Sequence, residues 1–257
     1  MKTVLTKKKP EKRLLAPLIS SAGRNYSGRI TVRHRGGGVK KMYRLVDFGQ
    51  EKKGIKGKVV ALEYDPNRTA YLALVEYEDK EKKYLLAPHN IKIGDEIICA
   101  DSAEVKIGAR MMLKNIPVGI EVFNIELEPN KGGKIVRSAG VVASVTAHEG
   151  KFVQLEMPSK EIRRVPAECF ATIGQVSHPE HRFKNSRKAG TRRKKGWRPT
   201  VRGSAMNPCD HPHGGGEGRT GIGMKHAKTP WGKPAMGVRT RRKNKWTNKL
   251  IIKRRKK

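Results

Sequence analysis

Net positive charge lies at the two ends of this 257-residue sequence, and that division limits what the chain can fold into. Residues 1–41 contain 12 Lys and Arg against one acidic residue, and residues 181–257 contain 25 against two. Residues 42–180 contain 20 basic and 20 acidic residues, so the whole net charge of +34 belongs to the ends. We therefore expect a folded, neutral centre with two extended cationic arms that bind a polyanion.

The first part of the neutral centre shows the period-two alternation of apolar residues that is typical of β-strands. It predicts a three-strand meander and two further strands. The expected strands are residues 58–64, 69–77, 84–87, 96–100 and 119–127. Five short strands within residues 42–128 predict a small closed barrel of the oligonucleotide-binding type, the OB fold. Because this region is neutral, we expect the barrel alone to bind RNA weakly.

A break in the alternation at PNKGGK, residues 129–134, predicts a domain boundary at residue 129. Short strands are expected again at residues 140–147, 151–157, 161–165 and 169–173. So few residues close most naturally as an SH3-like barrel over residues 129–180. The predicted fold class is all-β, with an OB-fold barrel followed by an SH3-like barrel. Extended basic arms are expected at residues 1–41 and 181–257.

The N-terminal arm has no sustained periodicity, and its basic residues are spaced for contacts with backbone phosphates. These residues are Arg24, Arg29, Arg33, His34 and Arg35. The glycines at 36–38 would let the main chain approach a phosphate-ribose surface closely. A disordered, solvated tail is the alternative. We favour RNA binding, because a glycine triplet near Arg recurs in the second arm at residues 214–216.

The C-terminal arm is organised around NPCDHPHGGGEGR, residues 207–219. This segment is too rich in Gly, Pro and His for a helix or a regular strand, so we expect an irregular loop. Its unpaired backbone groups need partners. Gly214, Gly215 and Gly216 allow close approach, and their successive N–H groups can form an anion-binding concavity. We therefore expect nucleic acid to order this loop.

Cations and rings surround the loop. We expect Arg198, Arg202, Arg219 and Lys225 to contact phosphates, and His211 and His213 to donate to RNA or stack on it. Three tryptophans, Trp197, Trp231 and Trp246, are interleaved with this charge, and each either stacks on a base or caps a turn.

Enzymatic and metal-binding alternatives use the same loop. Asp210 beside His211 has the residue types of a general base, with Ser204 nearby, but adjacent residues in an irregular loop seldom point suitably. Cys209 together with the two histidines could ligate zinc, but a fourth ligand at the usual spacing is missing. The GEGRTG segment at 216–221 lacks the strand and helix of a dinucleotide site. A His-dependent or zinc hydrolase and a DNA-compacting protein stay as alternative hypotheses.

No run of 18 apolar residues is present, so no membrane partner is expected. The first residues lack the apolar segment of a secretory signal, although they could pass for a short transit peptide. The three cysteines, Cys99, Cys169 and Cys209, are widely spaced, which favours reduced thiols over a disulfide framework.

Many short motifs resemble the universal large-subunit ribosomal protein L two family. They are GRN at 23–25, GRIT at 28–31, HRGGG at 34–38, DF at 47–48, LEYDPNR at 62–68, LAP at 86–88, NIPVG at 115–119, GG at 132–133, RSAG at 137–140, RPTVRGSAMNP at 198–208, HPHGGGEGR at 211–219 and TPWG at 229–232. The resemblance runs from about residue 15 to the C-terminus, and the glycine-histidine loop is its most specific part.

The resemblance implies a non-catalytic structural protein of the large ribosomal subunit, with both arms threaded into rRNA near the peptidyl-transferase region. It also implies contacts with other ribosomal proteins and the small subunit, and support of subunit association, tRNA binding and translation. No cofactor is expected, except Mg²⁺ held through rRNA. The residues expected at the RNA now include Arg68, Asn207 and Asp210, in addition to those named above.

Two departures from the family pattern bear on the compartment. The arm before Gly23 is short, and the lysine-containing segment at 220–228 is a variant of its own. Together they favour an organellar ribosome, in the mitochondrial matrix ahead of the plastid or the bacterial cytoplasm.

Overall fold

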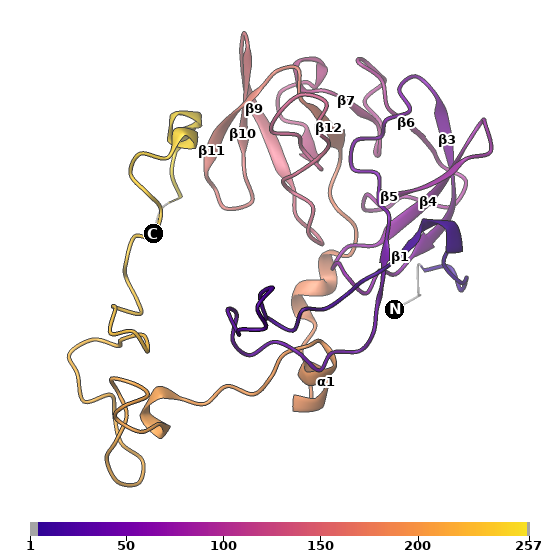
Figure 1. The fold of residues 1–257 in the computed structure, drawn as a ribbon. Coiled ribbons are helices and arrows are strands. Elements are labelled where there is room, and N and C mark those ends of the chain that lie inside the picture. Colours follow the sequence, from indigo (N-terminus) through magenta and orange to yellow (C-terminus); the bar gives the residue numbers. More distant parts are fainter. Residues whose placement is uncertain (1–4, 256–257) are drawn as a thin grey trace. The chain divides into compact units, whose positions relative to one another are not determined.

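The computed structural model describes residues 5–255, and this part of the chain forms two compact units (Figure 1). The barrel unit contains the chain up to Leu18, Lys40–Asn185, and the chain from Thr247 onward. The arm unit contains Ile19–Val39 and Ser186–Trp246. Each unit is therefore assembled from segments that lie far apart in the sequence.

Strands dominate the barrel unit, and the helical segments are short. The strands are β1 (Leu15–Pro17), β2 (Met42–Arg44), β3 (Lys56–Glu63), β4 (Leu72–Tyr77), β5 (Lys82–Leu86), β6 (Glu96–Ile98), β7 (Arg110–Met112), β8 (Glu121–Phe123), β9 (Ala143–Glu149), β10 (Phe152–Glu156), β11 (Ile162–Pro166), β12 (Phe170–Ile173) and β13 (Ile251–Lys253). The helical segments are η1 (Lys12–Leu14), η2 (Leu113–Asn115), η3 (Pro179–Phe183), α1 (Ala189–Lys194), η4 (Gly203–Ala205) and η5 (Trp246–Leu250). None of the helices in residues 5–255 has the length and apolar character needed to span a membrane.

The predicted meander is present as β3, β4 and β5, and β6 extends it to a four-stranded antiparallel sheet in the order β5-β4-β3-β6 (Figure 1). The turn after β3 is fixed by Asp65, whose carboxylate accepts the Asn67 N–H at 2.8 Å. Along β4, Leu72 and Leu74 pack into one buried cluster, while Ala73 and Val75 pack into another. Both faces of β4 are covered, which explains its nearly continuous apolar sequence.

A second sheet has seven strands in the order β13-β11-β10-β9-β8-β12-β7. Strands β7 and β8 come from the range predicted for the first barrel, yet they pair with β12 and β9. The boundary predicted at residue 129 therefore falls between β8 and β9, two hydrogen-bonded strands of one sheet. Alternation indicates that a segment is a strand, but it does not identify the partner of that strand.

Parts of both predicted arms belong to the barrel unit. Strand β1 pairs with β2, and β13 pairs with β11 at the edge of the seven-stranded sheet. The apolar residues Leu250, Ile251 and Ile252 interrupt the cationic tail, and the two isoleucines begin this last strand. The predicted arms at 1–41 and 181–257 thus correspond to an arm unit of residues 19–39 and 186–246, which contains the unpredicted helix α1.

A buried charged group crosses the core of the barrel unit. Arg110 on β7 is fully buried, and its guanidinium donates to a carboxylate oxygen of Glu126 at 2.9 Å. It also donates to the backbone carbonyls of Asn124 at 2.8 Å and Gly49 at 3.1 Å. Burial lowers the pKa of Arg110, while the neighbouring Glu126 opposes that effect. One side chain thereby joins the seven-stranded sheet to the segment that follows β2.

All three cysteines are free thiols. Cys99 and Cys169 are buried, and burial raises the pKa of the Cys99 thiol to about 11 and the pKa of the Cys169 thiol to about 12. These two thiols stay protonated near neutral pH and are shielded from reagents. Cys209, in the glycine-histidine loop, is exposed.

Candidate nucleic-acid interface

The two arms pair with each other within the arm unit. The Gly36 N–H donates to the Gly196 carbonyl at 2.9 Å, and the Arg198 N–H donates to the His34 carbonyl at 3.1 Å. Close approach of the backbones requires glycine here, because a Cβ on Gly38 would lie 3.0 Å from the Gly196 Cα. The sequence predicts two extended basic arms and gives no sign of a contact between them. The structure instead brings residues 34–39 and 194–198 together directly.

Stacked cations and indole rings reinforce this pairing. The Arg35 guanidinium lies 3.6 Å from the centre of the Trp197 ring, and Arg33 lies 5.3 Å from the centre of the Trp231 ring. Each contact joins an N-terminal arginine to a C-terminal tryptophan, and such cation–π contacts contribute about 0.5–1 kcal/mol at exposed sites. The outward N–H donors of both guanidinium groups stay free within the described chain. The stacking therefore fixes the position of each guanidinium group without neutralising its charge.

The glycine-histidine loop is irregular, as its composition predicts, but its first half has internal order. The Asn207 carbonyl accepts the N–H groups of Asp210 at 3.0 Å and His211 at 3.2 Å. The Gly215 N–H donates to Met206 at 3.0 Å, which closes the loop beside η4. His211 is buried, with 7% of its surface exposed, and its ring lies against Gly203.

Both loop histidines serve as hydrogen-bond acceptors. His211 Nδ1 accepts the backbone N–H of His213 at 3.0 Å, and His213 Nε2 accepts the backbone N–H of Lys228 at 2.9 Å. Each bond uses the lone pair of one nitrogen in the ring, so the two rings hold the backbone of the loop in place. Asp210 is exposed and makes no hydrogen bond to the His211 ring within the described residues. The arrangement of a carboxylate orienting a general base is therefore not formed.

The zinc alternative has no support from the geometry. Cys209, His211 and His213 are close in sequence, but nowhere in residues 5–255 do three His, Cys, Asp or Glu side chains form a group that could hold a metal ion. The two histidine rings lie 4.8 Å apart between centres, and each already binds a backbone N–H.

Most of the residues predicted to contact RNA are exposed. The exposed ones are Arg24, Arg29, Arg33, Arg35, Arg198, Arg202, Asn207, Asp210, Gly216, Arg219, Lys225 and Trp231. The half-buried ones are His34, Arg68, His213, Gly214 and Gly215. None of the arginines and lysines in the exposed set forms an ion pair with a carboxylate in the described part of the chain, where the observed pairs lie between residues 44 and 164. Their charge is left for another molecule.

The segment at 216–227, which begins in the last residues of the loop and continues beyond it, leaves its backbone donors unused. From residue 216 to residue 227, no backbone N–H donates a hydrogen bond to any acceptor in the described chain. Arg219 and Lys225 lie in the same segment and are exposed. Consecutive free N–H groups beside unpaired cations form a surface suited to phosphate oxygens.

Arg68 lies in the barrel unit, whereas the other residues predicted to contact RNA belong to the arm unit. Its Nε donates to the Asp65 carboxylate at 2.5 Å, and its guanidinium lies 5.4 Å from the centre of the Phe48 ring. Arg137 lies over the same ring at 4.4 Å, is exposed, and donates to the Gly133 carbonyl at 3.1 Å. The sequence gives no spacing signal that would join Arg137 to Arg68, because Phe48 brings them together from distant segments.

Comparison with protein-family models gives two matches. Residues 11–99 match the model described as Ribosomal Proteins L2, RNA binding N-terminal domain. Residues 106–232 match the model described as Ribosomal Proteins L2, C-terminal domain. Together they cover most of the chain, and they fit an all-β protein with an OB-fold domain followed by an SH3-like domain, which confirms the predicted fold class. The gap between the matches lies before the boundary predicted at residue 129.

Proposed function

This chain belongs to the ribosomal protein L2 family, an RNA-binding structural component of the large ribosomal subunit, and from that premise we propose that its arm unit is the main rRNA-binding surface. The observation that carries the proposal is the segment of unused backbone N–H groups at 216–227 beside exposed cations without carboxylate partners. The centre of the barrel unit, residues 42–180, contributes a smaller share of the binding energy, because it has no net charge and several of its cations pair with carboxylates.

The test measures the salt dependence of binding between the full chain and protein-free large-subunit rRNA. Replacing Arg198, Arg202, Arg219 and Lys225 with Gln should weaken binding and reduce the slope of log K against log salt by about 0.7–0.9 for each lost phosphate contact. The matched control replaces four exposed, unpaired lysines of the barrel unit, Lys80, Lys92, Lys114 and Lys151, with Gln. Equal slopes for the two variants would contradict the proposal.

We also propose that the glycine-histidine loop contacts rRNA near the peptidyl-transferase region, and that the protein supports tRNA binding and subunit association through a contact with the small subunit. The resemblance of HPHGGGEGR at 211–219 to the family's loop supports this location. The acceptor role of His211 supports a non-catalytic part in it, since its Nδ1 lone pair is already used.

Two substitutions at His211 separate positioning from catalysis. His211→Asn keeps an acceptor near the Nδ1 position, so its subunits should assemble better than those of the alanine variant and form peptide bonds at the normal rate per assembled subunit. His211→Ala should lower the yield of assembled subunits but not the rate of peptide-bond formation per assembled subunit. A loss of that rate with both variants would instead assign His211 to the chemistry.

For the compartment, we propose the mitochondrial matrix ahead of the plastid or the bacterial cytoplasm, supported by the variant segment at 220–228. Fractionation of the source cells, followed by sedimentation of ribosomes from each fraction, would identify the ribosome that contains this protein. Co-sedimentation with the cytoplasmic ribosomes of a bacterium would reject this compartment while leaving the rRNA-binding proposal intact.

A further inference from the structure

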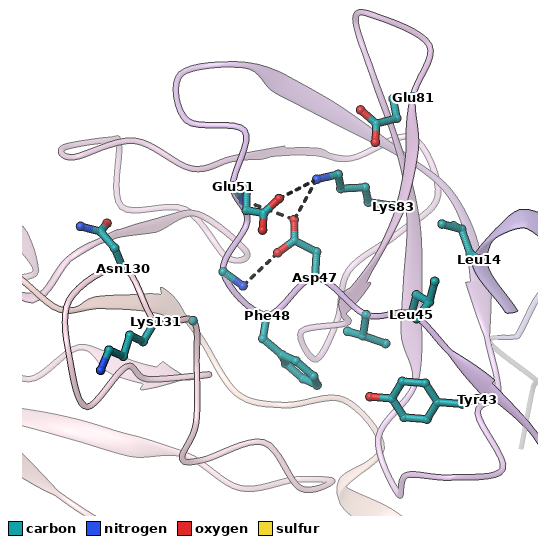
Figure 2. A pocket seen from close by; sticks show the side chains of 13 residues that line it. Leu14, Tyr43, Leu45, Asp47, Phe48, Glu51, Glu81, Lys83, Asn130 and Lys131 are labelled. Carbon is teal, nitrogen blue, oxygen red and sulfur yellow. Dashed lines mark hydrogen bonds and ion pairs between the residues drawn. The ribbon is translucent and has the colours of Figure 1, made fainter. Parts of the chain in front are cut away.

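A cavity of about 640 Å³ opens in the barrel unit beside the segment that follows β2 (Figure 2). Its apolar wall is formed by Leu14, Tyr43, Leu45 and Phe48. Figure 2 shows the Tyr43 and Phe48 rings and the Leu45 side chain directed into the same space, with Asn130 and Lys131 on the opposite side. The cavity is therefore lined by two aromatic rings and is large enough for a planar, partly apolar group.

The Asp47 carboxylate, which lines this cavity, already has hydrogen-bond and ion-pair partners. Asp47 accepts the backbone N–H groups of Gly49 at 2.9 Å and Gln50 at 2.7 Å, and its second oxygen lies 3.5 Å from the Lys83 ammonium. Lys83 also holds Glu51 at 3.3 Å (Figure 2). Because these contacts occupy and neutralise Asp47, it neither repels a nucleic acid strongly nor provides a cation site.

Two polar groups at the cavity are left for a ligand. The Tyr43 hydroxyl makes no hydrogen bond within residues 5–255, and the same holds for the side-chain N–H₂ of Asn130. The Asn130 carbonyl oxygen accepts from Lys53 at 3.1 Å, which orients the amide. A free hydroxyl and a free amide donor are suited to the polar edge of a nucleobase.

Two arginines contact one of the aromatic rings that line the cavity. Arg137 and Arg68 lie 4.4 Å and 5.4 Å from the centre of the Phe48 ring, and Phe48 lines the cavity. The exposed Arg137 guanidinium can hold a phosphate next to the cavity. The carboxylates that line the cavity are each paired with a lysine: Asp47 and Glu51 with Lys83, and Glu81 with Lys52. Arg137 has no carboxylate partner in residues 5–255, so the charge left at this site favours a nucleotide as the occupant.

We propose that this cavity binds one unstacked base of the large-subunit rRNA, which stacks on Tyr43 and Phe48 and presents its edge to Asn130. The inference rests on the proposed rRNA-binding function and adds a second kind of contact to it. The arm unit binds backbone phosphates, whereas this cavity would bind a base in a way that depends little on salt.

The test uses the full chain and protein-free large-subunit rRNA. Tyr43→Leu removes the ring but keeps an apolar side chain on β2, and it should weaken binding about 5- to 100-fold without changing the salt slope. Tyr43→Phe should bind within a few-fold of the unchanged protein, since it keeps the ring. The matched control is Tyr64→Leu, at an exposed tyrosine outside the cavity, which should bind normally.

A second variant keeps the proposal testable if Tyr43→Leu folds poorly. Leu45 is 48% exposed, so Leu45→Trp should fold and obstruct the part of the cavity beside Tyr43, with the same loss of affinity and the same unchanged slope. Normal binding by both variants, or a loss accompanied by a smaller salt slope, would overturn the base site. Absence of salt-dependent rRNA binding by the unchanged protein would instead overturn the proposed function.

The occupant can be identified directly in assembled large subunits. A photoreactive benzophenone side chain in place of Lys131, which lines the cavity and is exposed, should cross-link to a single rRNA nucleotide. Cross-linking to another ribosomal protein would show that a peptide fills the cavity and would overturn the proposal.

Discussion

At the scale of single residues, the glycine-histidine loop depends on the contact between Gly203 and His211. A Cβ at Gly203 would lie 2.4 Å from Cε1 and 2.5 Å from Nδ1 of the His211 ring. That ring is buried, and its Nδ1 holds the His213 N–H, so it has little freedom to move away. The ring and the glycine together set the position of the loop that carries the free backbone donors.

We therefore expect Gly203→Ala to disorder the loop. Overpacking of this kind costs about 1–3 kcal/mol, which should increase proteolytic cleavage within residues 207–219 and weaken rRNA binding. Gly190→Ala is the matched control, because no atom lies within 4 Å of its added Cβ and its φ is ordinary. Limited proteolysis and filter binding check the outcome. Equal behaviour of the two variants would show that the His211 ring can move.

At the scale of secondary-structure elements, Arg110 joins β7 to the segments around Gly49 and Glu126. Glu126 also accepts the backbone N–H groups of Phe170 at 3.1 Å and Asn130 at 3.2 Å, so its carboxylate is held from several sides. Loss of the arginine would leave a buried carboxylate without its counter-charge. Burial of both charges is itself costly, so the net contribution of this ion pair to stability is small. Its main effect is to hold β7 in position against the segments around Gly49 and Glu126.

Arg110→Met should lower the free energy of unfolding by about 3–5 kcal/mol, the typical effect of removing one partner of a buried ion pair. The matched control is Arg164→Met. Arg164 pairs with Glu149 at 2.7 Å on a partly exposed surface, where such pairs contribute less than about 1 kcal/mol. Urea unfolding of the full chain measures both variants. Similar losses for the two arginines would mean that the core tolerates the unpaired Glu126.

At the scale of the whole molecule, periodicity predicts the longer strands well. The expected segments at 58–64, 69–77 and 84–87 correspond to β3, β4 and β5, and the second set corresponds to β9, β10, β11 and β12. Strands of three residues such as β1, β7 and β13 are too short for periodicity to reveal, and their pairing partners define them. The strand expected at 119–127 is shortened to β8, because Asn124 adopts a positive φ of 49° directly after it.

The candidate interface was predictable in composition but not in arrangement. Charge and glycine content identify the loop at 207–219 and the basic residues beside it, and their roles in RNA binding stay predictions. The pairing of residues 34–39 with 194–198 depends on backbone contacts between distant glycines, which no local pattern encodes. The same holds for the cavity at Tyr43, whose wall comes from four separate segments.

Strands β1, β2 and β13 give the two arms a property that free tails lack. The chain leaves the barrel unit after β1, runs through residues 19–39 of the arm unit and returns at β2. It leaves again after η3, runs through residues 186–246 and returns before β13. Each arm is thus a loop with both ends tethered, and a tethered loop cannot be threaded end-first through a closed ring of RNA.

The rRNA must fold around each tethered arm, so adding this protein before the RNA is folded should give faster subunit assembly than adding it afterwards. Equal assembly rates for the two orders of addition would show that the RNA leaves its binding groove open from the side.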